Sequence, residues 1–250
     1  MSQLTVLRSY ALKSNPATLP PSVLLSHSET SVTLFDAFPK SIFHFLILPR
    51  PQPSLSIFDL ANLSSLLKCD NSKAKSVLLT MKEEAQSVKD MIESEMMKRY
   101  GFKWGIWTGF HAVPSMEHLH LHVLSNDLCS PRMRKKQHYQ SFHPKHGFFL
   151  HLDDVLSWFD AEPSYYDTVS QLKKSQYEPL LKGDFECWKC ERVIANMPAL
   201  KSHLQEEWDK EMQRETAKLK RKQKSPDLPT AKGTDALETV PKERRSPDAA

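Results

Sequence analysis

Short apolar segments near the start of the chain predict three β-strands. Each segment is rich in β-branched or aromatic residues and is bounded by Pro, Ser, Asp or Lys. They cover residues 22–26, 31–35 and 42–48. Pro39 and Lys40 fit a hairpin between the second and third segments. Pro49 and Pro51 end the third, because proline lacks the N–H that a sheet requires.

Residues 63–99 contain neither Gly nor Pro and repeat apolar side chains at helical spacing. This pattern predicts a long helix with a break near residues 70–72. Further strands are predicted over residues 102–108 and 118–125, and a short helix over residues 152–159. The mixed order of strands and helices favours an α+β fold with an antiparallel sheet.

The composition of the 250-residue chain, 40% hydrophobic and 26% charged, is typical of a soluble globular protein. We expect no membrane partner, because no apolar run approaches the ~20 residues of a membrane span. The first residues lack a basic segment followed by a long apolar one, so we expect no secretory signal. After Lys224 the chain is polar and rich in proline and charge, which predicts a disordered tail.

Three alternating histidines form the most informative segment. His118, His120 and His122 alternate with apolar residues, so on a strand their side chains share one face at a spacing of roughly 6.6–6.8 Å. Three interpretations are open: incidental histidines on a surface strand, a metal site, and nucleophilic or acid–base chemistry on a phosphate. Neutral imidazole is both a common metal ligand and a good nucleophile at pH 7.

A C-x-x-C pair in the last third of the chain predicts a small, separate zinc-finger module. Cys187 and Cys190 precede His203 at the spacing of a C₂H₂ finger, but no second histidine follows three to five residues later. Glu207 lies one helical turn after His203, so we expect these four residues to hold one structural zinc per chain. Glu206 or water is the alternative fourth ligand, and a redox-active cysteine pair is the rival interpretation. The residues expected to form the finger's core are Val193, Ile194, Met197, Leu200 and Leu204.

The net charge is only +4, but the basic residues are clustered. The first cluster is Arg132, Arg134, Lys135 and Lys136, and the second is Lys218, Lys220, Arg221, Lys222 and Lys224. Such blocks suit nucleic acid or nuclear import receptors, with a solvated surface as the alternative. We therefore expect a nuclear protein, with a cytoplasmic pool also open.

Several stretches resemble the histidine-triad superfamily and, within it, the aprataxin family. The run from His118 to Leu124 matches a signature in which three histidines alternate with apolar residues. Residues 36–49 are similar to the superfamily's nucleotide-binding hairpin, and the runs 109–123 and 135–142 resemble the aprataxin branch. The resemblance covers about residues 5–210. It implies a histidine-triad fold, an antiparallel sheet with a long helix, plus a small C-terminal ββα-like zinc finger.

The resemblance also implies roles for the histidines. His120 would attack the phosphorus of an adenylate and form a covalent nucleotidyl-histidine, which water then hydrolyses. His118 and His122 would orient His120 and contact the phosphate. His138 matches a histidine that contacts the phosphate and assists the leaving group, and His44 matches an additional histidine of the hairpin strand.

Other positions are implied to bind the nucleotide or DNA. Asp36 fits an acidic residue that accepts the ribose hydroxyls, and Lys40 and Ser115 fit positions near the nucleotide and phosphate. Taken alone, Asp36 is equally well a turn residue and Lys40 a solvated lysine. The residues expected to contact DNA are Arg50, Ser130, Arg132, Arg134, Lys135 and Lys136.

These features divide the chain into three predicted parts. They are a histidine-triad catalytic domain over 1–160, a zinc-finger module with its connecting segment over 161–215, and a basic tail over 216–250. The predicted function is that of a monomeric DNA-end repair hydrolase that removes AMP from adenylated 5′ ends at nicks or breaks, with GMP-capped 3′ ends as a related substrate. A small-molecule phosphoramidate or dinucleotide hydrolase and an inert nucleic-acid-binding adaptor stay open. In animals, members of the family also have a domain that binds phosphorylated peptides ahead of the catalytic one, and we do not expect such a domain here.

Overall fold

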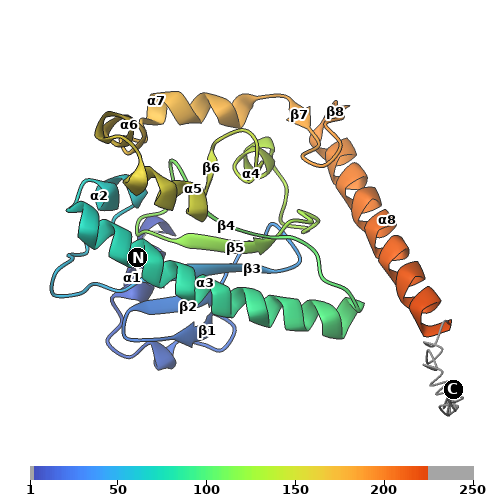
Figure 1. Ribbon diagram of the computed structural model, residues 1–250, viewed down its shortest axis with the longest axis horizontal. Coiled ribbons are helices and arrows are strands. Elements are labelled where there is room, and N and C mark those ends of the chain that lie inside the picture. The colour runs from blue at the N-terminus through green and yellow to red at the C-terminus, as the bar shows by residue number, and fades with distance from the viewer. Residues whose placement is uncertain (1–2, 225–250) are drawn as a thin grey trace, which may run out of the picture.

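The computed structural model describes residues 3–224, in which six strands form one antiparallel sheet in the order β1-β2-β3-β5-β4-β6 (Figure 1). The strands are β1 Leu24–His27, β2 Ser31–Phe35, β3 His44–Pro49, β4 Ile106–His111, β5 Leu121–Ser125 and β6 Phe149–His151. The three predicted N-terminal strands are confirmed with small shifts of their ends. The two later predictions began too early, since β4 starts at Ile106 and β5 at Leu121.

The helices include the predicted long helix and its break. They are α1 Val6–Ala11, α2 Leu63–Leu67, α3 Asn71–Tyr100, α4 Lys136–Gln140, α5 Leu152–Ser157, α6 Pro163–Val169, α7 Lys174–Tyr177 and α8 Met197–Lys224, with 3₁₀ turns at Gln3–Thr5, Pro16–Thr18, Trp158–Asp160 and Glu178–Lys182. Asn62 and Asp70 cap the starts of α2 and α3 through their side chains, which separates the two helices. None of the helices within residues 3–224 is long and apolar enough to cross a membrane.

The main core lies between α3 and one face of the sheet (Figure 1). Leu78 and Met81 of α3 belong to the same buried cluster as Leu121 and Val123 of β5. Because side chains alternate across a strand, His122 lies between these two residues on the opposite face of β5. The alternation along β5 thus separates the core from the histidine cluster.

The finger has the predicted two strands and helix, and its helix packs against the catalytic part. Its hairpin is β7 Phe185–Glu186 paired with β8 Val193–Ile194, and α8 follows. Leu200 and Leu204 of α8 lie in one buried cluster with Tyr139 and Phe149 of the catalytic part. The prediction that Val193 belongs to the finger's core is wrong, because this side chain is 72% exposed.

Helix α8 also corrects the predicted start of the tail. It continues to Lys224, so residues 216–224 of the predicted basic tail belong to this helix. Trp208 packs on Trp104 with ring centroids 4.5 Å apart, and Leu219 approaches Gly101 at the end of α3. These contacts anchor α8 on the catalytic part. The remaining residues of the predicted tail, 225–250, lie outside the described residues.

Candidate active site and zinc finger

His118 departs from the regular backbone expected for the triad. Both His118 and His120 precede β5, which begins at Leu121, and His118 has a φ of 87°, in the left-handed region that residues with a Cβ seldom adopt. The buried ring donates from Nε2 to the carbonyl of Pro49 at 2.7 Å. The prediction of three imidazoles lined up on one strand is therefore wrong for His118, because this tertiary contact turns its backbone.

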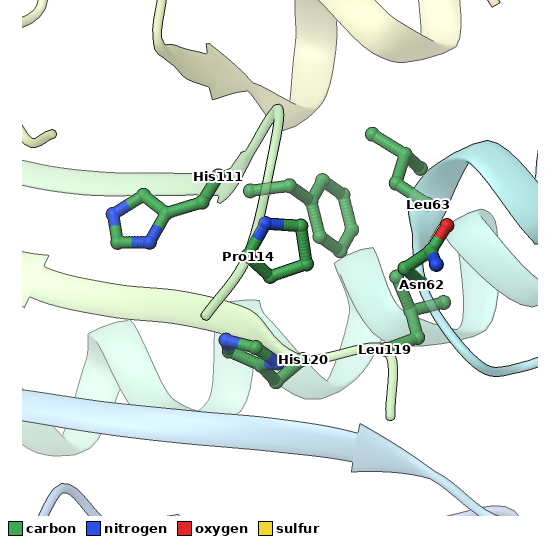
Figure 2. A pocket seen from close by; sticks show the side chains of 7 residues that line it. Asn62, Leu63, His111, Pro114, Leu119 and His120 are labelled. Atoms are coloured by element: carbon green, nitrogen blue, oxygen red, sulfur yellow. The ribbon is translucent and has the colours of Figure 1, made fainter. Parts of the chain in front are cut away.

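The backbone of His118 instead sets the protonation of His120. Nδ1 of His120 lies 2.7 Å from the His118 carbonyl oxygen, and a carbonyl can only accept a hydrogen bond. Nδ1 therefore carries the proton and Nε2 keeps a free lone pair. His120 lines a small pocket with Asn62, Leu63, Phe110, His111, Pro114 and Leu119. Figure 2 shows the side chains of His111, Pro114 and His120 around this pocket.

A chain of hydrogen bonds fixes the protons of His44 and His122. The Lys40 backbone N–H donates to Nδ1 of His44 at 3.1 Å, so the proton of the neutral His44 ring is on Nε2. That Nε2 lies 2.9 Å from Nδ1 of His122, which accepts. The proton of His122 is then on Nε2, a buried atom without a hydrogen-bond partner among the described residues. An N–H placed in this way suits a phosphate oxygen.

His111 is a candidate site residue that the sequence did not reveal. Its ring centroid lies 4.5 Å from that of His122, and it lines the pocket beside His120. Its Nε2 is buried and has no hydrogen-bond partner among the described residues. The residue ends β4, the strand paired with β5, and it lies two positions after Gly109, which pairs with His122. A correct strand pairing would have revealed it, since residues two apart share a face.

Burial keeps the whole histidine cluster neutral. Desolvation by burial is the main reason why the pKa values of His120, His122 and His111 are lowered. Neighbouring imidazoles lower the pKa of His122 and His111 further. The pKa of His44 falls to about 4, and so does that of His118. At neutral pH the cluster therefore offers an unprotonated nucleophile and uncharged donors.

The hairpin residues lie beside this cluster. Asp36 accepts from the Phe38 N–H at 2.6 Å, as a turn residue does, and its other oxygen lies 3.5 Å from Nε2 of His44. Lys40 is partly buried, and desolvation lowers its pKa despite the nearby carboxylate of Asp36. Ser115 is exposed on the loop between β4 and β5. The structure thus brings Asp36 and Lys40 to His44.

The residues predicted to contact DNA fall into two groups. Arg132, Arg134 and Lys135 are exposed on the loop before α4. The Lys136 ammonium lies 4.8 Å from the ring centroid of Phe185 in the finger hairpin. Two others are engaged within the fold: Arg50 donates to the carbonyls of Ser28 and Lys13 at 3.1 Å, and buried Ser130 accepts from the Arg132 N–H.

His138 lies on the short helix α4. Its Nδ1 accepts from the Arg134 N–H at 3.2 Å, so Nε2 carries the proton of the neutral ring. Desolvation by burial is the main reason why the pKa of His138 is lowered, and the charge of Lys40 lowers this pKa further.

The finger gathers three of the four predicted metal ligands. The ligand atoms of Cys187, Cys190 and His203 lie within 4.8 Å of one another, and Sγ of Cys190 is 3.2 Å from Nε2 of His203. Two thiols and an imidazole converging in this way fit zinc. Glu207 is outside this group, and its carboxylate accepts from Lys210 at 3.2 Å.

Both the catalytic part and the finger match families of known proteins. A family described as "Scavenger mRNA decapping enzyme C-term binding" matches residues 10–138, and a "C2HE / C2H2 / C2HC zinc-binding finger" matches residues 145–210. An aprataxin-like protein of Saccharomyces cerevisiae is 31% identical over 221 residues, which are 80% of this chain and 95% of that protein. The chain belongs to the aprataxin family.

Animal members of the aprataxin family are longer than the part matched here. An aprataxin-like protein of Drosophila melanogaster is 32% identical over 185 residues, 74% of this chain and 24% of that protein. Aprataxin of Gallus gallus is 29% identical over 190 residues, 76% of this chain and 52% of that protein. The chain thus spans from about a quarter to about half of the length of these relatives.

Solved structures of the aprataxin ortholog Hnt3 share the fold. Hnt3 in complex with DNA aligns with a TM-score of 0.64 at 26% identity, over 85% of this chain and 98% of that chain. Hnt3 in complex with DNA and guanosine aligns with a TM-score of 0.62 over 83% of this chain and 96% of that chain. The predicted α+β histidine-triad fold with a C-terminal finger is confirmed.

Proposed function

We propose that this aprataxin-family chain removes adenylate from DNA 5′ ends by nucleophilic catalysis at His120. The observation that carries the proposal is the fixed tautomer of His120, whose Nδ1–H is held by the His118 carbonyl while Nε2 stays unprotonated. A neutral imidazole with a free lone pair in a buried, uncharged cluster is prepared to attack phosphorus.

In the first step, Nε2 of His120 attacks the phosphorus of the adenylate. A P–N bond forms while the P–O bond to the 5′-phosphate of the DNA breaks, and that phosphate leaves with the electron pair. Because Nδ1 keeps its proton, the imidazole becomes cationic, and the His118 carbonyl at 2.7 Å stabilises this charge. His138 is the candidate contact for the leaving phosphate.

In the second step, water attacks the phosphorus of the nucleotidyl-histidine. A P–O bond forms, the P–N bond breaks, the water loses a proton to solvent, and His120 returns to its neutral form as AMP is released. His122 would hold a phosphate oxygen through its unpartnered Nε2–H in both steps. Because the nucleotidyl-histidine is cationic, the P–N bond breaks to release a neutral imidazole, which is a good leaving group.

A polymeric substrate accounts for the parts that surround the pocket. Exposed Arg132, Arg134 and Lys135 provide positive charge just before His138, which suits phosphates on either side of a nick. The Hnt3 relatives, which align over both the catalytic part and the finger, were solved in complex with DNA. We place the protein in the nucleus as a monomer.

The finger would hold one structural zinc through Cys187, Cys190, His203 and Glu207. The family description that matches residues 145–210 includes a C2HE ligand set, and Glu207 follows His203 by one helical turn. A bound metal would compete with Lys210 for the Glu207 carboxylate. Glu207→Gln should weaken zinc affinity by about tenfold or more, whereas Glu206→Gln should not. The opposite result would assign the fourth position to Glu206.

Product release by the purified full chain tests the function. Four substrates are compared: a nicked duplex with a 5′-adenylate, diadenosine polyphosphate, adenosine phosphoramidate and a methylated cap dinucleotide. The proposal predicts the highest kcat/KM on the adenylated nick. Preference for either adenosine compound would indicate a small-molecule hydrolase, and preference for the cap would indicate decapping. Binding to DNA without turnover of any substrate would indicate an adaptor.

A further inference from the structure

The hydroxyl of Tyr139 joins the finger to the short helix that carries His138. It donates to the Glu186 carbonyl at 2.7 Å and accepts from the Trp188 N–H at 2.9 Å. Glu186 and Trp188 flank Cys187, one of the three gathered metal ligands. Tyr139 is fully buried and directly follows His138 in α4. The Tyr139 side chain therefore connects the metal-binding turn with the helix that carries His138.

Both hydrogen-bonding capacities of this phenol are used. A hydroxyl has one proton to donate and lone pairs to accept with, and each is directed here at a backbone group of the finger. Burial raises the pKa of Tyr139, so the group stays a donor at neutral pH. The turn itself closes through backbone bonds, from the Cys187 N–H to the Arg192 carbonyl and from the Glu191 N–H to the Cys187 carbonyl.

Helix α4 depends on its contacts with the finger for its position. It has five residues, and its N-cap, Lys135, makes no side-chain capping bond. So short a helix has little stability of its own. Gln140, the residue after Tyr139, also bonds the finger side, because its Nε2 donates to the carbonyls of Gly183 at 3.0 Å and Asp184 at 2.7 Å.

We propose that Tyr139 is a positioning residue that couples metal occupancy of the finger to the placement of His138. When Cys187 is bound to a metal, the backbone on both sides of it is fixed, and the hydroxyl passes this constraint to α4. The coupling is reciprocal, so the same contact strengthens the finger's hold on the metal. The inference rests on the proposed function for its catalytic consequence.

A double-mutant cycle between Tyr139 and His138 tests the catalytic side in the zinc-loaded full chain. We expect Tyr139→Phe to lower kcat on an adenylated nick about tenfold, from the loss of one or two buried hydrogen bonds, with KM changed less than about twofold. In a His138→Ala background the same substitution should lower kcat by less than about twofold, because its effect passes through His138. An equal loss in both backgrounds would overturn the positioning role.

Two measurements without turnover test the coupling itself. We expect Tyr139→Phe to speed zinc transfer to a chromogenic chelator by about tenfold. We also expect it to shift the imidazole NMR signal of His138, which is assigned by its loss in His138→Ala. These two results stay interpretable if the wild-type chain releases no AMP, an outcome that would refute the proposed function alone.

Tyr166→Phe is the matched control. The Tyr166 hydroxyl is likewise buried and donates to the Leu67 carbonyl at 2.9 Å, away from the finger. This variant should leave kcat, zinc transfer and the His138 signal unchanged. If Tyr139→Phe behaves like this control in zinc transfer or in the His138 signal, the coupling is refuted.

Discussion

The histidine cluster and the finger differ in how their polar side chains are held in place. In the cluster, protein groups fix the proton of each triad-region ring: the His118 carbonyl holds His120, and Lys40 and His44 orient His122. In the finger, two thiols and an imidazole converge on one point, with Sγ of Cys190 only 3.2 Å from the His203 ring. The comparison indicates that protein groups alone organise the histidine cluster, whereas the ligand atoms of the finger are arranged for a metal.

Loss of the nucleophile should have the largest effect. His120→Ala should reduce AMP release from adenylated DNA by about 10⁴-fold or more, because no other group can form the covalent intermediate. The fold should persist, since the cluster is held by other contacts. His27→Ala, at an exposed histidine on β1, is the control and should retain full turnover. Substantial turnover by folded His120→Ala would contradict the assignment.

Removal of the metal ligands should affect the finger first. Cys187→Ser combined with Cys190→Ser should abolish stoichiometric zinc, measured by elemental analysis, and should lower the melting temperature by several degrees. We expect the loss of stability to extend beyond the finger, because Leu200 and Leu204 share a buried cluster with Phe149. Cys69→Ser should change neither quantity. Zinc retained by the double variant would instead favour a metal site among the active-site histidines.

Acid should destabilise the fold through the neutral histidines. The pKa of His44 and that of His118 are about 4 in the folded chain, against an ordinary value of 6.5. Their stabilising contribution is therefore complete above pH 6.5 and is lost as the pH falls toward 4, on the order of 3 kcal/mol for each ring. Urea unfolding at pH 7.5, 6.0 and 5.0 measures this loss. A constant free energy of unfolding over that range would show that folding does not lower the pKa of these rings.

The basic loop should have the smallest effect, confined to DNA binding. Arg134→Ala with Lys135→Ala should flatten the dependence of log K on log salt by about one to two, at roughly 0.9 per lost phosphate contact on duplex DNA. Affinity should fall equally across sequences, because phosphate contacts carry no base information. The charge-matched pair Lys68→Ala and Lys73→Ala, exposed near α3, should leave the slope unchanged. If the two pairs behave alike, the DNA path lies elsewhere.

Local patterns predicted most of the fold and several of the residues that the structure brings together at the two candidate sites. The alternation of His120 and His122 with Leu121 and Val123 is a property of neighbouring residues, and the structure confirms it across β5. The break before α3 was also visible, because Asp70 is a capping residue within the sequence. The spacing of Cys187, Cys190 and His203 is likewise a local feature of the sequence, so it predicts the finger.

Errors arose where distant segments meet. The turn of His118 depends on the Pro49 carbonyl, and the role of His111 depends on the pairing of β4 with β5. The basic end of α8 was interpreted as tail, although Trp208 and Leu219 attach this helix to the end of α3. No local pattern reports such contacts, so neither the continuity of the finger with the catalytic part nor the length of its helix could be predicted.

The proposed mechanism requires His120 to become covalently nucleotidylated through Nε2. The most direct test is to quench a reaction of the full chain with adenylated DNA within the first turnover and to map the modified peptide by mass spectrometry. We predict one AMP group on His120, stable in base and labile in acid, as expected for a phosphoramidate. An AMP group on another residue, or rapid AMP release with no covalent adduct at any time, would contradict the mechanism.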